Sequence, residues 1–169
     1  MSLKPELYIQ PPEIVDVEGQ VIFLAGPIQG APLWQPEAAS LIHSRKDIMV
    51  ASPRKSYPEG TFVYEKQVDW ETHFIGRAKR FGAVMFWLAK QLEDTPGRSY
   101  AQTSRFELGE SKRDHERDGI KLVVGIEPGF GNERYIRRRI SQDCPDVTIT
   151  NNLLDTVDAT LLIMDQTVD

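Results

Sequence analysis

Two short acidic segments hold the side chains with the clearest chemical potential. Glu107 lies within residues 103–110, where we expect the first turns of a helix that follows a loop. The helix dipole and the free backbone N–H groups at a helix start hold a nearby carboxylate in its ionised form. An ionised carboxylate can act as a nucleophile or a base. Glu107 is therefore a candidate catalytic residue, and an ordinary helix-start charge is the alternative.

The second acidic segment, residues 67–71, contains Asp69 and Glu71 on either side of Trp70. Two carboxylates suit cleavage of a bond to an anomeric carbon, because one can trap the oxocarbenium-like sugar while another acidic group manages the proton. Either Asp69 or Glu71 could face a cleft, since a register error of one residue turns a helical side chain by about 100°. Trp70 is a candidate substrate-binding residue, and packing into the core is its alternative.

Further candidate binding residues lie around the predicted loops. Gly26 and Pro27 begin a loop of small residues in which the backbone can approach a sugar or a phosphate closely. Trp34 could stack on a base, and Arg54 could bind an anion, although a packing anchor and a surface charge are the respective alternatives. Ser104 could donate a hydrogen bond to a phosphate. Neither a GxGxxG nor a GxxxxGK[ST] motif is present, which disfavours dinucleotide binding and nucleoside-triphosphate hydrolysis.

Composition narrows the class of protein. A length of 169 residues with 27% charged side chains suits one globular domain, and a formal charge of −5 argues against a general nucleic-acid binder. One cysteine and three scattered histidines offer neither a disulfide nor a zinc-ligand spacing, so we expect no metal and a cytoplasmic location. No apolar run approaches the roughly 20 residues of a membrane span, so we expect no membrane partner.

Apolar β-rich runs alternate with amphipathic stretches along the chain, which is typical of an α/β fold. Proline residues predict an irregular lead-in over residues 1–18, followed by a single domain over residues 19–169. The alternation predicts a flavodoxin-like doubly wound sheet of about five mainly parallel strands with helices on both faces. Strands are expected at residues 21–25, 48–51, 82–89, 120–126 and 147–150, and helices at residues 36–45, 63–80, 103–117, 133–141 and 153–164.

Ligands of such sheets sit outside the carboxyl ends of the strands, near the point where the strand order reverses. The loops that follow the first three predicted strands are residues 26–34, 52–61 and 90–104. We therefore expect the functional site to gather at these loops and at the helix starts beside them.

Three segments follow one another in a characteristic order: IFLAGPI at residues 22–28, QVDWET at residues 67–72 and FELGE at residues 106–110. Together they resemble the nucleoside 2-deoxyribosyltransferase family, and the resemblance extends in segments over about residues 21–125. It implies a flavodoxin-like enzyme that cleaves the N-glycosidic bond of a 2′-deoxynucleoside and passes the deoxyribosyl group to another base. It also implies a small-molecule nucleoside or nucleotide as substrate, no cofactor, and a homo-oligomer.

The resemblance assigns roles to particular residues. Glu107 matches the family's nucleophile, and Asp69 is the best match for the acidic residue that assists proton transfer at the base. Gly26 and Pro27 would line the sugar side of the pocket. The family's aspartate shortly before the nucleophile has no clear equivalent here.

Two related functions are the alternatives within this fold. A 2′-deoxynucleoside 5′-monophosphate N-hydrolase would use water in place of the acceptor base, with Arg54 and Ser104 as phosphate donors. A catalytically silent nucleotide-binding domain would keep the pocket without turnover. A structural or partner-binding domain, in which Glu107 is a surface charge, is the alternative outside this chemistry.

Overall fold

A computed structural model describes residues 2–166 and contains one six-stranded sheet in the order β1-β3-β2-β4-β5-β6. Every neighbouring pair of strands is parallel. The strands are β1 (Tyr8–Ile9), β2 (Val21–Ala25), β3 (Met49–Ala51), β4 (Gly82–Leu88), β5 (Leu122–Ile126) and β6 (Thr148–Thr150). The helices are η1 (Pro5–Leu7), α1 (Trp34–His43), α2 (Tyr64–Phe81), α3 (Gln102–Asp118), α4 (Glu133–Asp143) and α5 (Leu153–Asp165).

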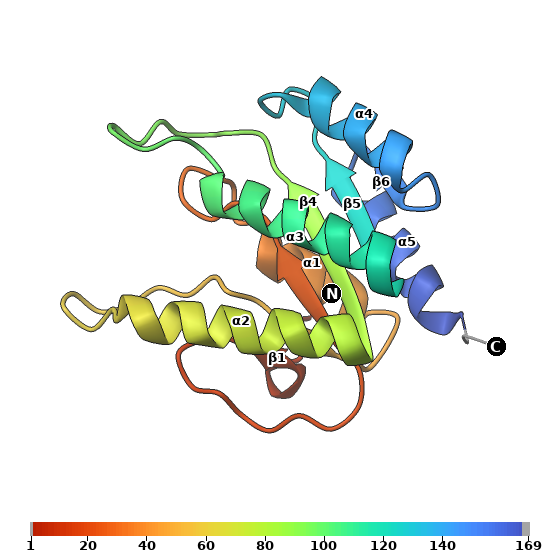
Figure 1. The fold of residues 1–169 in the computed structure, drawn as a ribbon. Coiled ribbons are helices and arrows are strands. Elements are labelled where there is room, and N and C mark those ends of the chain that lie inside the picture. Colours follow the sequence, from red (N-terminus) through yellow and green to blue (C-terminus); the bar gives the residue numbers. More distant parts are fainter. Residues whose placement is uncertain (1, 167–169) are drawn as a thin grey trace.

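Helices cover both faces of the sheet. One face packs against α2, α3 and α4, and the other packs against α1 and α5 (Figure 1). All five residues of β2 are buried, with Phe23 in the core on the α2 side and Leu24 in the core on the α1 side. This alternation is why the central strands read as continuous apolar runs. The predicted α/β doubly wound fold is confirmed.

The lead-in is more ordered than the sequence suggests. Tyr8 and Ile9 form the edge strand β1, which pairs with Val50 and Ala51 of β3. The backbone N–H of Ser52 then donates to the carbonyl oxygen of Ile9 at 2.9 Å. The prediction of a wholly irregular segment over residues 1–18 was therefore wrong, because two residues between prolines are too few to show a strand pattern. An edge strand also tolerates nearby proline, since only one of its sides needs backbone donors.

The strand order reverses around β2 and β4. The chain leaves β2 through α1 toward β3, and it leaves β4 through α3 toward β5 on the other face of the sheet. The loops after β2 and β4 are joined by the carbonyl oxygen of Gly30, which accepts hydrogen bonds from the N–H groups of Leu92 and Glu93 at 2.7 and 3.1 Å. The loops in which we expect a ligand therefore meet at this reversal of the strand order.

The residue before α3 stores backbone strain. Ala101 adopts φ 59° and ψ 30°, the left-handed conformation, which costs an L-amino acid with a Cβ roughly 1 kcal/mol. The side chain of Tyr100 next to it donates to the carbonyl oxygen of Ala89 at 2.8 Å, so this turn is tied to the end of β4. The turn sets the direction in which α3 starts.

Replacing Ala101 with glycine tests this strain. We expect Ala101→Gly to raise the free energy of unfolding by up to about 1 kcal/mol in urea denaturation, because glycine adopts the left-handed conformation without a Cβ clash. The matched control is Ala159→Gly inside α5, where the same change should lower stability by about 1 kcal/mol. Equal losses in both variants would show that the Ala101 turn is not strained.

Candidate functional site

Glu107 lies on the side of α3 that faces α2. It is the sixth residue of α3, one position before Leu108, which is buried in the core under the helix. The carboxyl group itself is half-buried. The side chains of Lys79 and Asp114 bridge α2 and α3 at 2.6 Å, farther from the helix starts, so the two helices lie side by side over one face of the sheet (Figure 1). Glu107 therefore stands between these helices on the strand-end side of that bridge.

The surroundings of Glu107 favour its protonated form. The pKa of Glu107 is raised from its ordinary 4.5 to about 8: burial is the largest cause, and the charges of Glu71 and Glu110 together raise this pKa by more than Lys79 lowers it. The expectation that the helix start holds this group ionised was therefore wrong. Helix-dipole stabilisation fades beyond the first turn, and Glu107 lies in the second turn of α3. A carboxyl group that is still protonated at pH 7 can act as a general acid by donating that proton.

Glu71 is the carboxylate partner on α2. It is half-buried, and burial raises its pKa, while a hydrogen bond from Gln67 partly opposes that shift. The Nε2 of Gln67 donates to Oε1 of Glu71 at 2.7 Å. The charge of Glu71 raises the pKa of Glu107, so the structure places these two side chains within electrostatic reach of each other. Sequence reasoning left Glu71 as an alternative and gave Gln67 no role, although their spacing of four residues on a helix was a usable signal.

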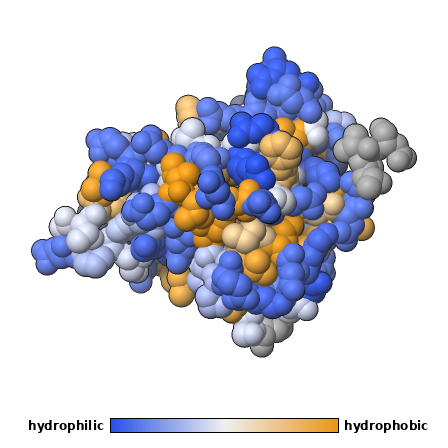
Figure 2. Space-filling view, turned by 90° about the horizontal axis from the view of Figure 1, so that it is seen from below, coloured by the Kyte–Doolittle hydropathy of each residue, from blue (hydrophilic) through white to orange (hydrophobic). Residues whose placement is uncertain are grey.

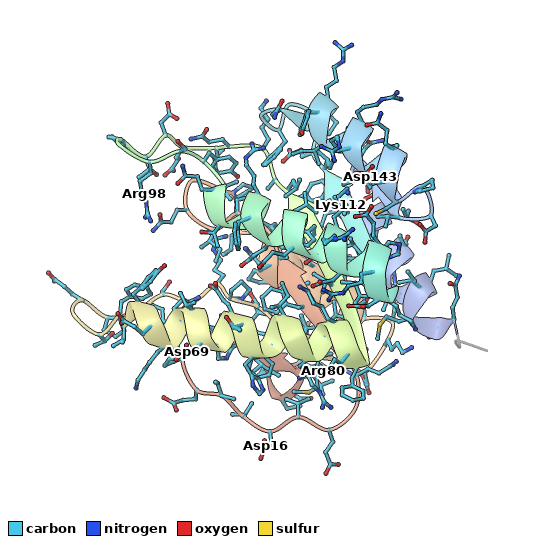
Figure 3. The ribbon with its side chains drawn as sticks, in the orientation of Figure 1. Asp16, Asp69, Arg80, Arg98, Lys112 and Asp143 are labelled. Carbon is cyan, nitrogen blue, oxygen red and sulfur yellow. The ribbon has the colours of Figure 1, made fainter. Side chains whose placement is uncertain are left out.

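Asp69 lies away from this pair. Its side chain is exposed on α2, where Figure 3 labels it, and it forms no hydrogen bond within residues 2–166. Two residues along a helix turn a side chain by about 200°, so Asp69 and Glu71 project from nearly opposite sides of α2. The structure therefore does not bring the predicted proton-transfer residue Asp69 together with Glu107.

Neither of the two candidate tryptophans is available to a ligand. Trp70 has no exposed surface and packs against Phe23 and Phe74, with ring centroids 6.3 and 4.7 Å away. Trp34 is 2% exposed, and its Nε1 donates to the carbonyl oxygen of Pro27 at 3.0 Å. Both residues occupy the sheet-facing side of their helices, where large apolar groups fill the core. Their assignment as substrate-binding residues is therefore corrected to core packing.

Arg54 is engaged by its own protein. Its guanidinium donates to the carbonyl oxygens of Ile28, Ala31 and Pro32 at 2.8, 3.3 and 2.8 Å, and to Oε1 of Gln35 at 3.0 Å. These bonds occupy both terminal nitrogens of the guanidinium. Arg54 therefore holds the loop after β2 in place, and the predicted role in binding an anion is not supported by this geometry.

Gly26 and Pro27 lie at the reversal of strand order, where both are buried. A Cβ on Gly26 would stand 2.2 Å from the carbonyl oxygen of Trp87 and 2.8 Å from Cζ2 of Trp34, so only glycine fits between them. Ser104, in the first turn of α3, is also buried. These three residues are therefore buried beside the loops after β2 and β4, and direct contact with a ligand stays a prediction.

A pocket of about 470 Å³ lies at the strand ends, on the side of the loop after β2 that faces α1. Its lining draws on all three expected loops, through residues such as Gln29, Ser56 and Glu93, and also on Tyr8 of β1. The lining includes neither Glu107 nor Glu71. Glu71 and Glu107 stand instead on the α2–α3 side, so these two carboxyl groups and the pocket lie on different sides of the sheet.

Neither known proteins nor a metal or membrane signature identifies this chain within the described residues. The sequence matches no known protein-family model and no curated protein. Within residues 2–166, no three or more histidine, cysteine, aspartate or glutamate side chains are grouped as a metal would require. No helix in the same range combines the length and the apolar character needed to cross a membrane. A functional assignment therefore rests on the residues and the geometry of the site.

The pH dependence of stability tests the environment of Glu107. Between pH 4.5 and about 8 the folded protein retains a proton on Glu107 that the unfolded chain has released, so the contribution of Glu107 to stability is full at low pH and is lost over this range. We expect Glu107→Gln to gain stability relative to wild type as the pH rises from 4.5 to 8, by a few kcal/mol in total, since one pKa unit corresponds to about 1.4 kcal/mol.

Thermal unfolding at pH 5 and pH 8.5 measures this difference. Glu65→Gln is the matched control, because Glu65 is an exposed carboxylate in the first turn of α2. A stability difference between wild type and Glu107→Gln that is constant with pH would show that Glu107 titrates normally.

Proposed function

We propose that this protein is a glycosyl-transferring enzyme in which Glu107 attacks the anomeric carbon of a 2′-deoxynucleoside and the deoxyribosyl group passes to another base. The observation that carries the proposal is that two half-buried glutamates, Glu107 and Glu71, lie on neighbouring helices beside the strand ends, where the charge of Glu71 raises the pKa of Glu107. Two carboxyl groups placed together are the usual equipment for cleaving a glycosidic bond through a covalent intermediate. The identity of the sugar as 2-deoxyribose is supported by the resemblance of the three sequence segments.

One proton shared by the pair suits both halves of this reaction. At neutral pH Glu107 carries the proton, because burial and the charge of Glu71 favour its neutral form. In the proposed first step, this proton moves through Glu71 to the leaving base as the C1′–N bond breaks, and a Glu107 oxygen forms the bond to C1′. In the second step, a nitrogen of the acceptor base attacks C1′, the ester bond breaks, and the proton of the acceptor returns to the pair. Atoms and charge balance without a further reactant.

Glu71 takes the role that sequence reasoning assigned to Asp69. Glu71 is half-buried and its charge raises the pKa of Glu107, whereas Asp69 is exposed on another side of α2. A proton carrier must reach its partner directly or through one water molecule. The position of Glu71 meets this requirement better than that of Asp69.

A homo-oligomer remains part of the proposal. Seen from below, the molecule shows apolar residues gathered in the middle of a largely polar face (Figure 2). The lead-in crosses this side beneath α2 (Figure 1), and its residues Ile14 and Val15 are 49% and 44% exposed. Contiguous apolar surface of this kind is typical of protein interfaces.

Base exchange by purified variants tests the proposed reaction. We expect wild type to convert a deoxynucleoside and a free base into the exchanged pair, with kcat at least 10³-fold lower in Glu107→Gln and about 10²-fold lower in Glu71→Gln. Asp69→Asn is the matched control and should stay within about twofold of wild type, since general acid–base loss costs 10²–10⁴-fold. Chromatography of the bases and nucleosides gives the rates.

The choice of substrates separates the alternatives. Base release from 2′-deoxynucleoside 5′-monophosphates alone, without transfer, would replace the transferase by the N-hydrolase. Binding of a nucleotide without cleavage would replace both by a silent binding domain. Full activity in Glu107→Gln would contradict the proposed nucleophile.

The pH profile of kcat/KM tests the single shared proton. We expect kcat/KM to fall tenfold per pH unit above about 8, because the pair then loses the proton that the leaving base requires. A profile that instead rises through pH 8 and stays high would show that Glu107 acts only as a free carboxylate and that the leaving base obtains its proton elsewhere.

A further inference from the structure

The side-chain amide of Gln67 joins three parts of the protein. Its Nε2 donates to the carbonyl oxygen of Pro53 at 2.9 Å and to Oε1 of Glu71 at 2.7 Å. Its Oε1 accepts a hydrogen bond from the hydroxyl of Tyr57 at 2.8 Å. The amide thus links the end of β3, the following loop and the carboxylate pair.

Only one orientation of this amide satisfies its neighbours. An amide offers two N–H donors and one carbonyl acceptor, and here both donors meet oxygen acceptors while the carbonyl meets a hydroxyl. A flipped amide would place its oxygen against the oxygens of Pro53 and Glu71. The network therefore fixes which side of Gln67 faces Glu71, and that side is a donor.

The anchor of the network lies outside α2. Pro53 is buried directly after β3, so its carbonyl oxygen is held by the sheet rather than by the helix. Gln67 and Glu71 are four residues apart on α2, a spacing at which side chains meet but remain free to separate in solvent. The hydrogen bond to Pro53 keeps the Gln67 side chain from swinging into solvent. Gln67 in turn limits the positions open to the Glu71 carboxylate.

Tyr57, in the loop after β3, supplies the third hydrogen bond of the network. Burial and the nearby charge of Glu71 both raise the pKa of Tyr57, so its hydroxyl keeps its proton and remains a donor. The ring of Tyr57 packs edge-on against Phe62 with centroids 5.3 Å apart. The loop after β3 is therefore connected to the carboxylate pair through a single amide.

We propose that Gln67 is the positioning residue of this site: its side-chain amide, held by Pro53 and Tyr57, fixes the carboxylate of Glu71 beside Glu107. A role for Gln67 in the reaction rests on the proposed function, whereas its effect on the pKa values of Glu71 and Glu107 does not. A donor aimed at Glu71 favours the charged form of that residue and so leaves the shared proton on Glu107. The hydrogen bond from Gln67 thereby favours the state in which Glu107 begins the reaction protonated.

Carboxyl NMR titration tests this assignment without any substrate. We expect Gln67→Leu to raise the pKa of Glu71 and to lower that of Glu107 by about one unit, because a less charged or displaced Glu71 repels the Glu107 carboxylate less. Tyr57→Phe removes one hydroxyl and should shift both groups in the same directions by a smaller amount. It also serves as the second variant should Gln67→Leu fail to fold.

Two matched controls accompany these variants. Gln142→Leu changes an exposed glutamine of α4, and Tyr64→Phe changes an exposed tyrosine at the start of α2. Both should leave the two titrations unchanged. Unaltered titration of Glu107 in folded Gln67→Leu would overturn the proposal.

If the wild-type protein exchanges bases, the kcat and KM of the Gln67→Leu variant provide a second test. We expect Gln67→Leu to lower kcat about tenfold or more with KM within about threefold, since misplacement of a proton carrier affects the chemical step more than binding. A rise in KM with unchanged kcat would overturn positioning in favour of a binding role. Shifted titrations in a protein whose wild type cleaves no nucleoside would instead uphold the positioning of Glu71 and reject the proposed reaction.

Discussion

The parallel pairing of β2 with β4 is the contact on which the rest of the site depends. Glycines stand at both ends of this pair, and a Cβ on either would strike a carbonyl oxygen of the opposite strand: Gly82 would meet Val21 at 1.8 Å, and Gly26 would meet Trp87 at 2.2 Å. Five residue pairs lie in register between them. Because α2 leads into β4 and α3 follows it, this pairing also fixes the helices that carry Glu71 and Glu107.

The raised pKa of Glu107 persists although a lysine lies nearby. Lys79 is the cation that lowers the pKa of Glu107, yet its ammonium group is paired with Asp114 at 2.6 Å. Burial is the largest cause of the raised pKa of Glu107, and the charges of Glu71 and Glu110 raise this pKa by more than Lys79 lowers it. Glu107 thus keeps a raised pKa near a lysine whose ammonium group already pairs with another carboxylate.

The sequence predicted the positions of strands and helices better than the roles of individual side chains. Residues 21–25 are an uninterrupted apolar run between breakers, and the structure places β2 at those residues. Trp34 and Trp70 were misread because helical periodicity says which side of a helix is apolar but not whether a large ring there meets a ligand or a strand. The sequence could not show which of Asp69 and Glu71 faces the site, because both are acidic and they are only two positions apart. The raised pKa of Glu107 comes first from burial and then from Glu71, which belongs to another helix and is distant in sequence, so no local pattern could reveal it.

The junction of α2 with β4 has a mechanical consequence. Helix α2 ends at Phe81 and the strand begins at Gly82, with no connecting loop. A movement of α2 would therefore have to displace the central strand of the sheet, so this side of the site has no hinge. The segments of residues 52–63 and 89–101 join strands to helices without crossing the core, so their shape can vary without displacing the sheet. Changes in these segments that spare Pro53, Tyr57, Tyr100 and Ala101 would keep the contacts that position Glu71 and the start of α3.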